Sequence, residues 1–385
     1  MKICHIAPNA PYNDYWGYQD NLLPKYQKKL GHDVTVIITN LTHKDGTIVE
    51  TDCSDYVLND GVRVIRLAKR RFPVASTLLS HMPVMNYLKE IKPDFIFYHG
   101  LISTTIYEVI RYKKRFNPDC IIVQDNHLDY NIGSRAETFK QKVFREHHRN
   151  TVRNTLAHVT KVYGVTPWRK TYAEDYFLVP TAKTDILIMG ADDEQIDFAH
   201  REQIRIDIRQ EHCISNDDFL IVTGGKIDRK KKIDQLMQAC VGVDKVKLLV
   251  FGNVSDDLKD EFERLVAENQ NIIYIGWIDA SKVYNYFFAA DLVFFPGQHS
   301  VLWEQACAAK VPCVFEKWEG MEHVNNGGNS DFVDNVTVES LREKILELRF
   351  TPKYQEMKKV AESEKTDIYL YSHIAEKSLE CAKKS

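Results

Sequence analysis

One segment constrains the fold more than any other, because strand, loop, helix and strand follow one another without a gap. The apolar run Leu292–Phe295 stops at Pro296-Gly297, a polar turn follows, and a short helical pattern ends at Pro312. A second apolar run starts at Cys313. This order predicts a parallel α/β fold, in which the loops at the carboxyl ends of strands bind ligands.

Two residues after the polar turn are candidate ligand contacts. Ser300 is expected to cap the helix, and the free N–H groups behind it offer a seat for a phosphate. Glu304 falls in the first helical turn, where a carboxylate can accept two hydrogen bonds from a vicinal diol such as a ribose. Alternatively, Glu304 only complements the helix dipole, and the loop taken alone favours that alternative.

Length and composition predict a soluble protein of two domains. A chain of 385 residues with 44% hydrophobic residues can build two cores. No apolar run approaches the length that spans a bilayer, and Met1–Ile6 is expected to be a first strand rather than a signal peptide. The eight cysteines form no Cys-x-x-Cys pair, which favours buried free thiols in a reducing cytoplasm.

Positive charge is concentrated in one part of the chain, although the formal net charge is only −3. Between Gly61 and Lys170 there are 20 Lys and Arg against 8 Asp and Glu, a balance that attracts phosphate-rich partners. RNA-binding and zinc-finger patterns are absent, so an anionic membrane surface is favoured over nucleic acid, with a solvated face as the alternative. Lys69–Pro73 and the apolar Val74–Met85 predict an amphipathic surface helix.

Motifs of several other enzyme classes are absent. No Asp-x-Asp occurs, which argues against a metal-dependent sugar transferase of the single-domain type. Neither Gly-x-x-x-x-Gly-Lys-Ser/Thr nor Gly-x-Gly-x-x-Gly occurs, which argues against a P-loop nucleotidase and a dinucleotide oxidoreductase.

The remaining landmarks are short motifs spread along the chain. The apolar run Phe219–Thr223 leads into Gly-Gly-Lys, with Lys231 further along the same turn. Glu304-Gln305-Ala306 precedes a proline, Ile186–Asp192 reads Ile-Leu-Ile-Met-Gly-Ala-Asp, and Tyr371–Glu376 lies near the end. Together these motifs resemble the retaining GT-B glycosyltransferases of the family numbered four, also called glycosyl transferases group 1. The resemblance is most specific from Phe219 to Val314 and extends over nearly the whole chain.

One half of the family's donor motif differs in this chain. The family has a first Glu eight residues before the second, and counting back eight positions from Glu304 leads to Pro296. Gly297, Gln298 and His299 are therefore the residues left to contact the donor sugar.

The resemblance implies two doubly wound, Rossmann-like α/β domains that face each other across a cleft. The acceptor-side domain is expected over residues 1–190 and the nucleotide-sugar domain over residues 191–367. Residues 368–385 are expected to form a helix that packs back on the first domain.

The resemblance also implies roles for individual side chains. Lys226 and Lys231 are expected to stabilise the charge that develops on the departing diphosphate, whereas Lys230 and Lys232 are interpreted as solvated charges. His127, after the strand Cys120–Gln124, is expected to orient the sugar.

Catalytic candidates are His127, Lys226, Lys231 and Glu304. The expected donor contacts are Gly225, Lys226, Lys231, Gly276, Trp277, Ile278, Gln298, His299, Ser300, Val301 and Glu304. Of these, Gly276, Trp277 and Ile278 are expected from the resemblance to hold the nucleotide base through backbone groups. The expected acceptor-side contacts are Tyr15, Trp16 and Gly17.

The implied reaction moves a sugar from a nucleotide-diphosphate sugar, UDP- or GDP-linked, to an acceptor hydroxyl with retention of configuration. No metal, other cofactor or covalent nucleophile is expected, and the leaving phosphate would deprotonate the incoming hydroxyl. The acceptor is expected to be a saccharide or a lipid-linked saccharide of a bacterial envelope or capsule pathway. The protein would be cytoplasmic, with peripheral contact to the inner face of the plasma membrane.

Two alternatives share the predicted fold. A nucleotide-sugar 2-epimerase would release an isomerised sugar nucleotide without an acceptor. A non-catalytic binding or scaffold protein would bind the nucleotide sugar and leave it intact.

Overall fold

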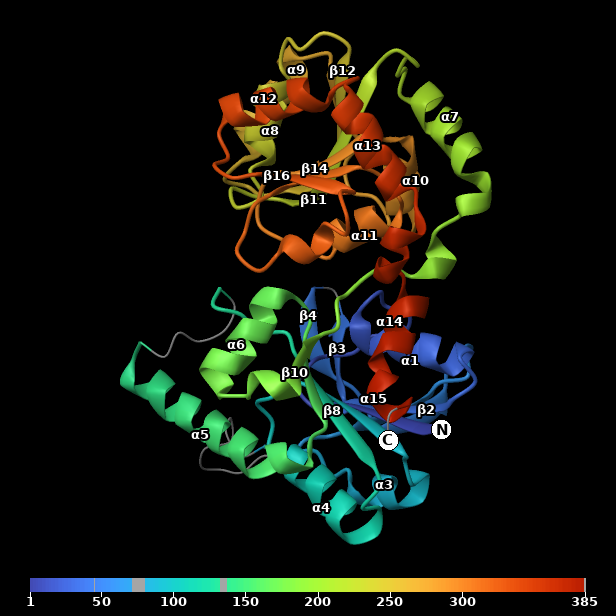
Figure 1. Ribbon diagram of the computed structural model, residues 1–385, viewed down its shortest axis with the longest axis vertical. Helices are drawn as coiled ribbons and strands as arrows, with labels where there is room; N and C mark the ends of the chain where they lie inside the picture. Colours follow the sequence, from blue (N-terminus) through green and yellow to red (C-terminus); the bar gives the residue numbers. More distant parts are fainter. Residues whose placement is uncertain (45, 71–79, 132–136, 384–385) are drawn as a thin grey trace. The chain divides into compact units, whose positions relative to one another are not determined.

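The strands form two large parallel sheets, one in each of two units (Figure 1). The computed structural model describes residues 1–44, 46–70, 80–131 and 137–383. Unit 1 comprises Met1–Met189 and Tyr371–Ser385, and unit 2 comprises Gly190–Leu370. The predicted α/β fold class is confirmed. The surface helix expected over Val74–Met85 falls mostly on residues 71–79, which lie outside the described residues.

The elements of unit 1 alternate between strand and helix over most of its length. In chain order they are β1 (Lys2–Ala7), α1 (Gln19–Lys29), β2 (Asp33–Thr39), β3 (Leu41–Lys44), β4 (Thr47–Glu50), β5 (Ser54–Val57), β6 (Arg63–Leu67), α3 (Met85–Ile91), β7 (Phe95–His99), α4 (Ile106–Phe116), β8 (Ile121–Asn126), α5 (Phe139–Thr155), η1 (Leu156–His158), β9 (Lys161–Gly164), α6 (Pro167–Phe177), η2 (Thr181–Lys183), β10 (Thr184–Ile186), α14 (Tyr371–Ser378) and α15 (Glu380–Lys383).

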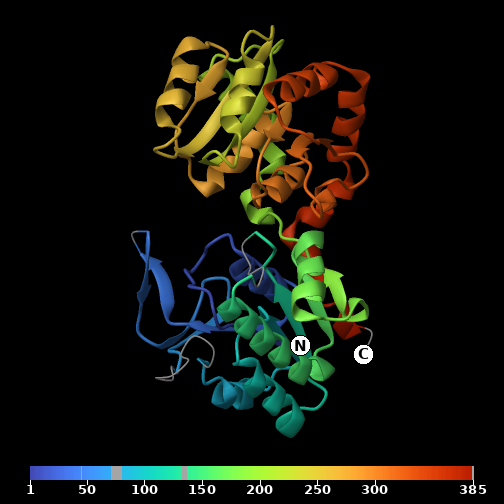
Figure 2. The same ribbon diagram turned by 90° about the vertical axis from the view of Figure 1, so that its left-hand side faces the viewer.

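The main sheet of unit 1 has eight strands in the order β10-β9-β8-β7-β1-β2-β6-β5. Only the edge strand β5 runs antiparallel to its neighbour in this sheet. The central strands β1, β2, β7 and β8 consist almost wholly of buried residues, as expected when helices cover both faces. A separate hairpin, β3–β4, lies at one side of the unit (blue strands in Figure 2). The strand order reverses between β1 and β7, so the loops after these two strands diverge.

Unit 2 is built in the same alternating way. Its elements are η3 (Asp193–Gln195), η4 (Phe198–His200), α7 (Arg201–Glu211), β11 (Phe219–Ile227), α8 (Ile233–Cys240), β12 (Val246–Val254), α9 (Lys259–Glu268), β13 (Ile272–Tyr274), η5 (Ala280–Lys282), α10 (Val283–Ala289), β14 (Leu292–Phe295), α11 (Leu302–Ala308), β15 (Cys313–Glu316), η6 (Glu322–Val324), β16 (Ser330–Val333), α12 (Val338–Leu348), α13 (Pro352–Ala361) and η7 (Glu364–Tyr369).

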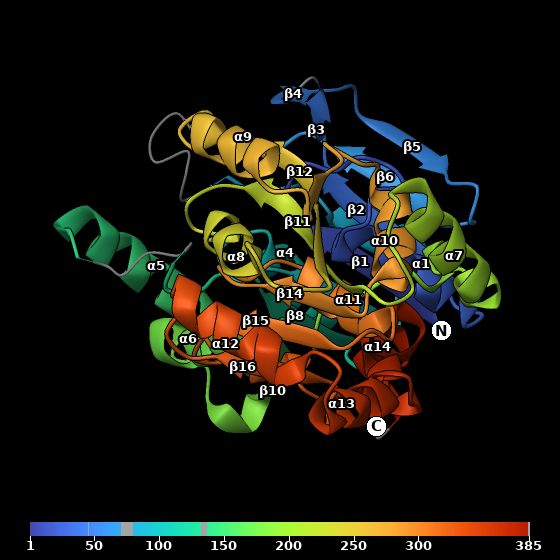
Figure 3. The same ribbon diagram turned by 90° about the horizontal axis from the view of Figure 1, so that it is seen from above.

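The sheet of unit 2 has six parallel strands in the order β13-β12-β11-β14-β15-β16. Numbered along the chain this is 3-2-1-4-5-6, the order of dinucleotide-binding domains, with its reversal between β11 and β14. Helices α8, α9 and α12 lie on one side of the sheet and α10 and α11 on the other (Figure 3). Leu236, Phe262 and Ile345 from the first group join buried strand residues in one core.

Near its end the chain returns to unit 1 through α14, which packs against α1. Tyr371 stacks on Tyr26, and the Gln27 amide donates to the Ser378 hydroxyl at 2.9 Å. None of the helices in the described parts combines the length and the apolar character that crossing a membrane requires.

Asp291, just before β14, ties α7 to the sheet of unit 2. Its carboxylate accepts hydrogen bonds from Arg205 at 2.6 Å, from Arg209 at 3.2 Å and from the N–H of Leu220 at 2.7 Å. Arg209 is buried. A buried guanidinium is stable only while its counter-charge is present, so Asp291 is expected to carry part of the stability of the unit.

We expect Asp291→Asn to lower the free energy of unfolding by about 3 kcal/mol, because Arg209 would be left as an uncompensated buried charge. Urea unfolding at neutral pH measures this difference. The matched control Asp217→Asn removes an exposed carboxylate of the same unit and should change stability by less than about 0.5 kcal/mol. Equal effects of the two substitutions would contradict the structural role of Asp291.

Candidate functional site

In unit 2 two loops meet where the strand order reverses. The β11 loop (residues 228–232) and the β14 loop (residues 296–301) both follow strand carboxyl ends. A Cβ atom on Gly297 would lie 2.4 Å from the carbonyl oxygen of Lys230, and the N–H of Gln298 donates to that oxygen at 2.9 Å. Only glycine permits this close approach. Gly297, which ends the strand in the sequence, therefore also lets the two loops pack against each other.

Lys231 is the cation that contacts the β14 loop. Its Nζ donates to the carbonyl oxygens of Gln298 at 2.5 Å and His299 at 3.3 Å, and burial lowers its pKa. Lys226 instead lies on β11 with its side chain 75% exposed and its Nζ 3.4 Å from Asp228. Of the two predicted diphosphate cations, Lys231 is held by the β14 loop, whereas Lys226 is largely exposed beside Asp228.

The neighbouring lysines differ from each other. Lys230 is exposed, as expected of a solvated charge. Lys232 is not solvated, and that prediction is wrong, because its Nζ donates to Glu316 Oε1 at 2.5 Å. Glu316 is a buried residue of β15 that needs a counter-charge. Lys232 therefore anchors the β11 loop to the sheet.

The helix after β14 begins one residue later than expected. Val301 is the N-cap of α11, and no side chain caps this helix. Ser300 contributes only its carbonyl oxygen, which accepts from the N–H of Trp303 at 3.0 Å. The predicted capping role of Ser300 is therefore wrong, because the backbone turn places the residue before the cap. Contact of Ser300 and Val301 with a donor stays a prediction.

Glu304, in the first turn of α11, is fully buried between two imidazoles. His299 Nε2 donates to its two oxygens at 2.9 and 3.1 Å, and His323 Nε2 donates to Oε1 at 2.7 Å. Burial alone would raise the pKa of Glu304, but the attraction and hydrogen bonds of His299 and His323 outweigh it and lower the pKa to about 2. Glu304 is therefore ionised at neutral pH and holds both rings in place.

His323 is a residue of this site that the sequence analysis did not single out. It lies in η6, within the loop that follows β15, and the Tyr369 hydroxyl donates to its carbonyl oxygen at 2.7 Å. The sequence could have indicated His323 only through its position after a strand of the parallel sheet, where ligand-binding loops lie. Because Glu304 is fully buried and both rings cover its oxygens, a ribose hydroxyl can reach this carboxylate only if an imidazole moves.

Gly276, Trp277 and Ile278, the predicted base contacts, form an irregular segment after β13. The carbonyl oxygen of Gly276 accepts from the N–H of Gly252 at 2.7 Å. Gly252 has a φ of +124°, and a Cβ atom there would collide with the oxygen of Gly225. The segment is thus hydrogen-bonded to β12, whose Gly252 lies against Gly225 of β11, and Trp277 is exposed. Base contact stays a prediction.

In unit 1 a series of buried hydrogen bonds runs from α1 to the end of β8. His5 Nε2 lies 2.7 Å from Gln27 Oε1, and His5 Nδ1 lies 3.1 Å from His99 Nε2. His99 Nδ1 lies 2.7 Å from Asp125 Oδ2, which also accepts from Nε2 of the predicted residue His127 at 3.2 Å. The structure thereby connects His127 to four polar residues that sequence reasoning left apart.

The charges in this series follow from burial and from neighbouring carboxylates. Burial would lower the pKa of His99, but Asp125 and then Asp20 outweigh it and raise the pKa to about 9. Burial and then the charge of His99 lower the pKa of His5 to about 3. His99 therefore donates to both Asp125 and His5, and neutral His5 donates to Gln27.

A pocket of about 460 Å³ opens at the reversal point of unit 1. Ala7, His99 and Asn126, at the carboxyl ends of β1, β7 and β8, contribute to its wall together with His127. The ring of His127 is partly exposed and donates to the buried carboxylate of Asp125. The signal for this pocket was present in the sequence as polar residues at the ends of apolar runs.

The predicted acceptor-side residues lie beside this pocket rather than in its wall. Trp16 stacks on His43 and contacts the ring edge of Tyr18, and both of these line the pocket. Tyr15 is exposed, and among the described residues no atom lies within 4 Å of a Cβ atom placed on Gly17. Contact with an acceptor therefore stays a prediction for all three.

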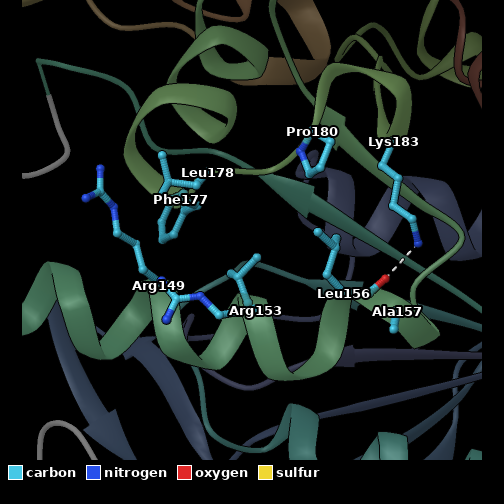
Figure 4. Close-up of a pocket in the computed structure, with 9 residues that line it drawn as sticks. Arg149, Arg153, Leu156, Ala157, Phe177, Leu178, Pro180 and Lys183 are labelled. Carbon is cyan, nitrogen blue, oxygen red and sulfur yellow. Dashed lines mark hydrogen bonds between the residues drawn. The ribbon is translucent and has the colours of Figure 1, made fainter.

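A second hollow of unit 1, of about 290 Å³, lies between α5 and the segment from α6 to η2 (Figure 4). Lys183 Nζ donates to the carbonyl oxygens of Leu156 at 2.7 Å and Val159 at 2.6 Å. Arg149 donates to the carbonyl oxygen of Tyr176 at 2.7 Å. These two cations join the helices to one another, so the hollow is a structural junction.

Two sets of side chains among the described residues have the spacing of metal ligands, namely His99 with Asp125 and His127, and His299 with Glu304 and His323. Imidazole and carboxylate are suitable ligands for zinc and similar ions. In each set the imidazoles also donate to the carboxylate, so the acid has hydrogen-bond partners within the set.

Comparisons with known proteins give a family match within unit 2 and a similarity in fold over both units. Residues 204–364 match the family model described as Glycosyl transferases group 1. A protein from the cps region of Klebsiella pneumoniae, called an uncharacterized 41.2 kDa protein, is 28% identical over 94 residues. That match spans 24% of this chain and 25% of the relative.

Two solved structures illustrate the similarity in fold. A glycosyltransferase from Rickettsia africae is 15% identical with a TM-score of 0.68, and the match covers 99% of this chain and 97% of that one. Anabaena Alr3699/HepE in complex with UDP is 15% identical with a TM-score of 0.66, and the match covers all of both chains. The chain thus has the GT-B fold of two Rossmann-like units, and most of its second unit matches the family model of the group 1 glycosyltransferases.

Proposed function

We propose that this protein transfers a sugar from a nucleotide-diphosphate sugar to an acceptor hydroxyl, with retention of the anomeric configuration. The donor would be UDP- or GDP-linked, and the acceptor a saccharide or lipid-linked saccharide in bacterial polysaccharide or glycolipid synthesis. The observation that carries the proposal is Lys231, held against the β14 loop inside the segment that matches the group 1 family. UDP bound to the Anabaena relative supports a uridine donor.

The proposed chemistry breaks the bond between sugar and diphosphate, so negative charge develops on the diphosphate. An ammonium group has three N–H donors, and Lys231 uses two of them on Gln298 and His299. The third is left for a phosphate oxygen, and partial burial strengthens that attraction. His127 would orient the sugar while the leaving phosphate takes the proton of the acceptor hydroxyl.

The proposed contact between Glu304 and the donor ribose has a structural condition. A ribose hydroxyl reaches the carboxylate only when His299 or His323 turns away from it. If both rings stay, His299 is the group that meets the donor, and Glu304 positions it. Both cases need the negative charge of Glu304, because both rings are held by it.

The proposal is tested by incubating the protein with a panel of sugar nucleotides and saccharide acceptors in the presence of EDTA. We expect acceptor-dependent release of nucleoside diphosphate that EDTA leaves unchanged, because Lys231 supplies the cation. Loss of transfer that Mg²⁺ or Mn²⁺ restores would contradict metal independence and point to one of the two histidine–carboxylate sets. Isomerised sugar nucleotide without an acceptor would indicate an epimerase, and binding without turnover would indicate a scaffold protein.

Lys231→Ala should lower kcat by about 100-fold and change KM much less, because the ammonium acts mainly on charge that develops in the transition state. The matched control Lys230→Ala removes the exposed neighbouring charge and should leave kcat within about twofold. Glu304→Gln should mainly weaken nucleotide binding. Steady-state kinetics and nucleotide titration of the folded variants measure these differences. Wild-type kcat in Lys231→Ala would refute the leaving-group role.

Reversible binding of unit 1 to anionic membranes is also proposed. Helix α5 runs along the outside of unit 1 (Figure 1) and begins with Phe139, which is 83% exposed, beside Lys140 and Lys142. Val143, one residue further, is exposed as well. An apolar and basic helix end of this kind can enter a headgroup layer.

Vesicle pelleting should show stronger binding to anionic than to neutral lipid, and binding should weaken as salt rises. Lys140→Glu/Lys142→Glu should reduce pelleting several-fold. The control Lys259→Glu, which reverses an exposed charge on unit 2, should have no effect. Equal pelleting with neutral and anionic vesicles would exclude this surface.

A further inference from the structure

Gln19 is the unusual residue in the 460 Å³ pocket of unit 1. It opens α1, lines the pocket and is only 3% exposed. Within the described residues, neither Oε1 nor Nε2 of its carboxamide has a hydrogen-bond partner. A buried donor and acceptor left unpaired cost about 1–3 kcal/mol each, so a side chain of this kind calls for an explanation.

Gln27, on the same helix, is a buried glutamine with a structural role and serves for comparison with Gln19. It is fully buried, its Oε1 accepts from His5 at 2.7 Å, and its Nε2 donates to Ser378 at 2.9 Å. Both polar atoms are satisfied by the protein. Gln19 has the same chemistry and burial, yet its two atoms have no partner in the part of the chain that the structure describes.

Other groups in the pocket wall have complementary character. Asp20 presents a partly exposed carboxylate, which lies 3.4 Å from His99 Nδ1, and His127 presents a partly exposed ring. Tyr18 and Leu101 contribute apolar surface. Pockets that pair apolar walls with a few convergent polar groups are typical of small-molecule sites.

We propose that this pocket binds a saccharide, with the Gln19 carboxamide donating to one sugar hydroxyl and accepting from its neighbour, and with Asp20 accepting from a third. The role of this saccharide as the acceptor rests on the proposed function, whereas its binding does not. Gln19 would then be a specificity-determining residue, because its amide reads the positions of adjacent hydroxyls.

The pocket wall favours a hydroxyl-bearing ligand over an anion. Neither Lys nor Arg is among the described residues that line it, and the Asp20 carboxylate repels negative groups. The charge of His99 in this wall is already balanced by Asp125, and both of its ring nitrogens are engaged by Asp125 and His5. A hydroxyl donates and accepts at once, which matches the two unsatisfied atoms of Gln19. The ring face of a sugar, which carries C–H groups, can lie on apolar wall residues such as Tyr18 and Leu101.

The test compares Gln19→Met with Gln27→Met. The probes are methyl glycosides of glucose, galactose, mannose and N-acetylglucosamine, and binding is followed by saturation-transfer NMR and by the shift in Tm. The unsubstituted protein should respond to at least one glycoside. Gln19→Met should lose that response while keeping or raising the Tm of the free protein, since it removes two unpaired polar atoms. Gln27→Met should lower the Tm, since it breaks two satisfied bonds.

A second arm separates a free saccharide from a lipid-linked one. Vesicles that contain a glycolipid with the responding sugar should bind the protein more than plain vesicles, and Gln19→Met should remove that difference if the headgroup enters the pocket. Binding to the free glycoside alone would support a soluble saccharide. Where transfer is measurable, Gln19→Met should raise the acceptor KM by about tenfold and leave the donor KM unchanged, which corresponds to about 1.4 kcal/mol.

These measurements test saccharide binding in the pocket independently of the proposed transfer reaction. Saccharide binding that Gln19→Met abolishes would support the pocket even if no transfer occurred. The inference is overturned if the unsubstituted protein responds to no glycoside of the panel, or if Gln19→Met responds as the unsubstituted protein does. A fall in Tm equal to that of Gln27→Met would show that Gln19 is merely structural.

Discussion

Parallel strands joined by crossovers all end at the same edge of a sheet, and this constraint places the candidate site residues of both units. In each unit the chain starts at a central strand and later crosses to its other side, so two loops diverge at that strand. The loops after β1 and β7 frame the pocket of unit 1, and the loops after β11 and β14 carry the Lys231 contact of unit 2. The candidate site residues therefore lie at these two reversal points, where neighbouring loops diverge and leave room for a ligand.

Both units also place one buried carboxylate between two imidazoles. Asp125 accepts from His99 and His127, and Glu304 accepts from His299 and His323. In each case burial alone would raise the pKa of the acid, and the histidines reverse that shift. Removing one partner of such a buried ion pair destabilises the fold. Each carboxylate therefore holds its two imidazoles in a fixed direction.

The fold could be read from the sequence because apolar runs, glycines and prolines act over short distances. Leu292–Phe295 predicted β14, and the break at Gly297 predicted a loop that lies at the reversal point. The partners of the buried acids could not be predicted in this way. His323 lies 19 residues from Glu304, and His99 lies 26 residues from Asp125, so only the sheet order brings them together. The predicted cap of α11 was wrong by one residue, because the backbone turn before the helix places Val301 rather than Ser300 at the N-cap.

The return of α14 has a consequence for the order of folding. Gln27 and Ser378 bond across a separation of 351 residues, with the whole of unit 2 inserted between them. A disordered loop of that length would make closure slow, although the cost in free energy grows only with the logarithm of length. Within unit 2, however, the N–H of Ala191 donates to the carbonyl oxygen of Tyr369 at 2.8 Å, so its first and last residues lie side by side. Once unit 2 is folded, its part of this long loop is reduced to a short connection between Met189 and Tyr371, and α14 only has to find α1 within unit 1.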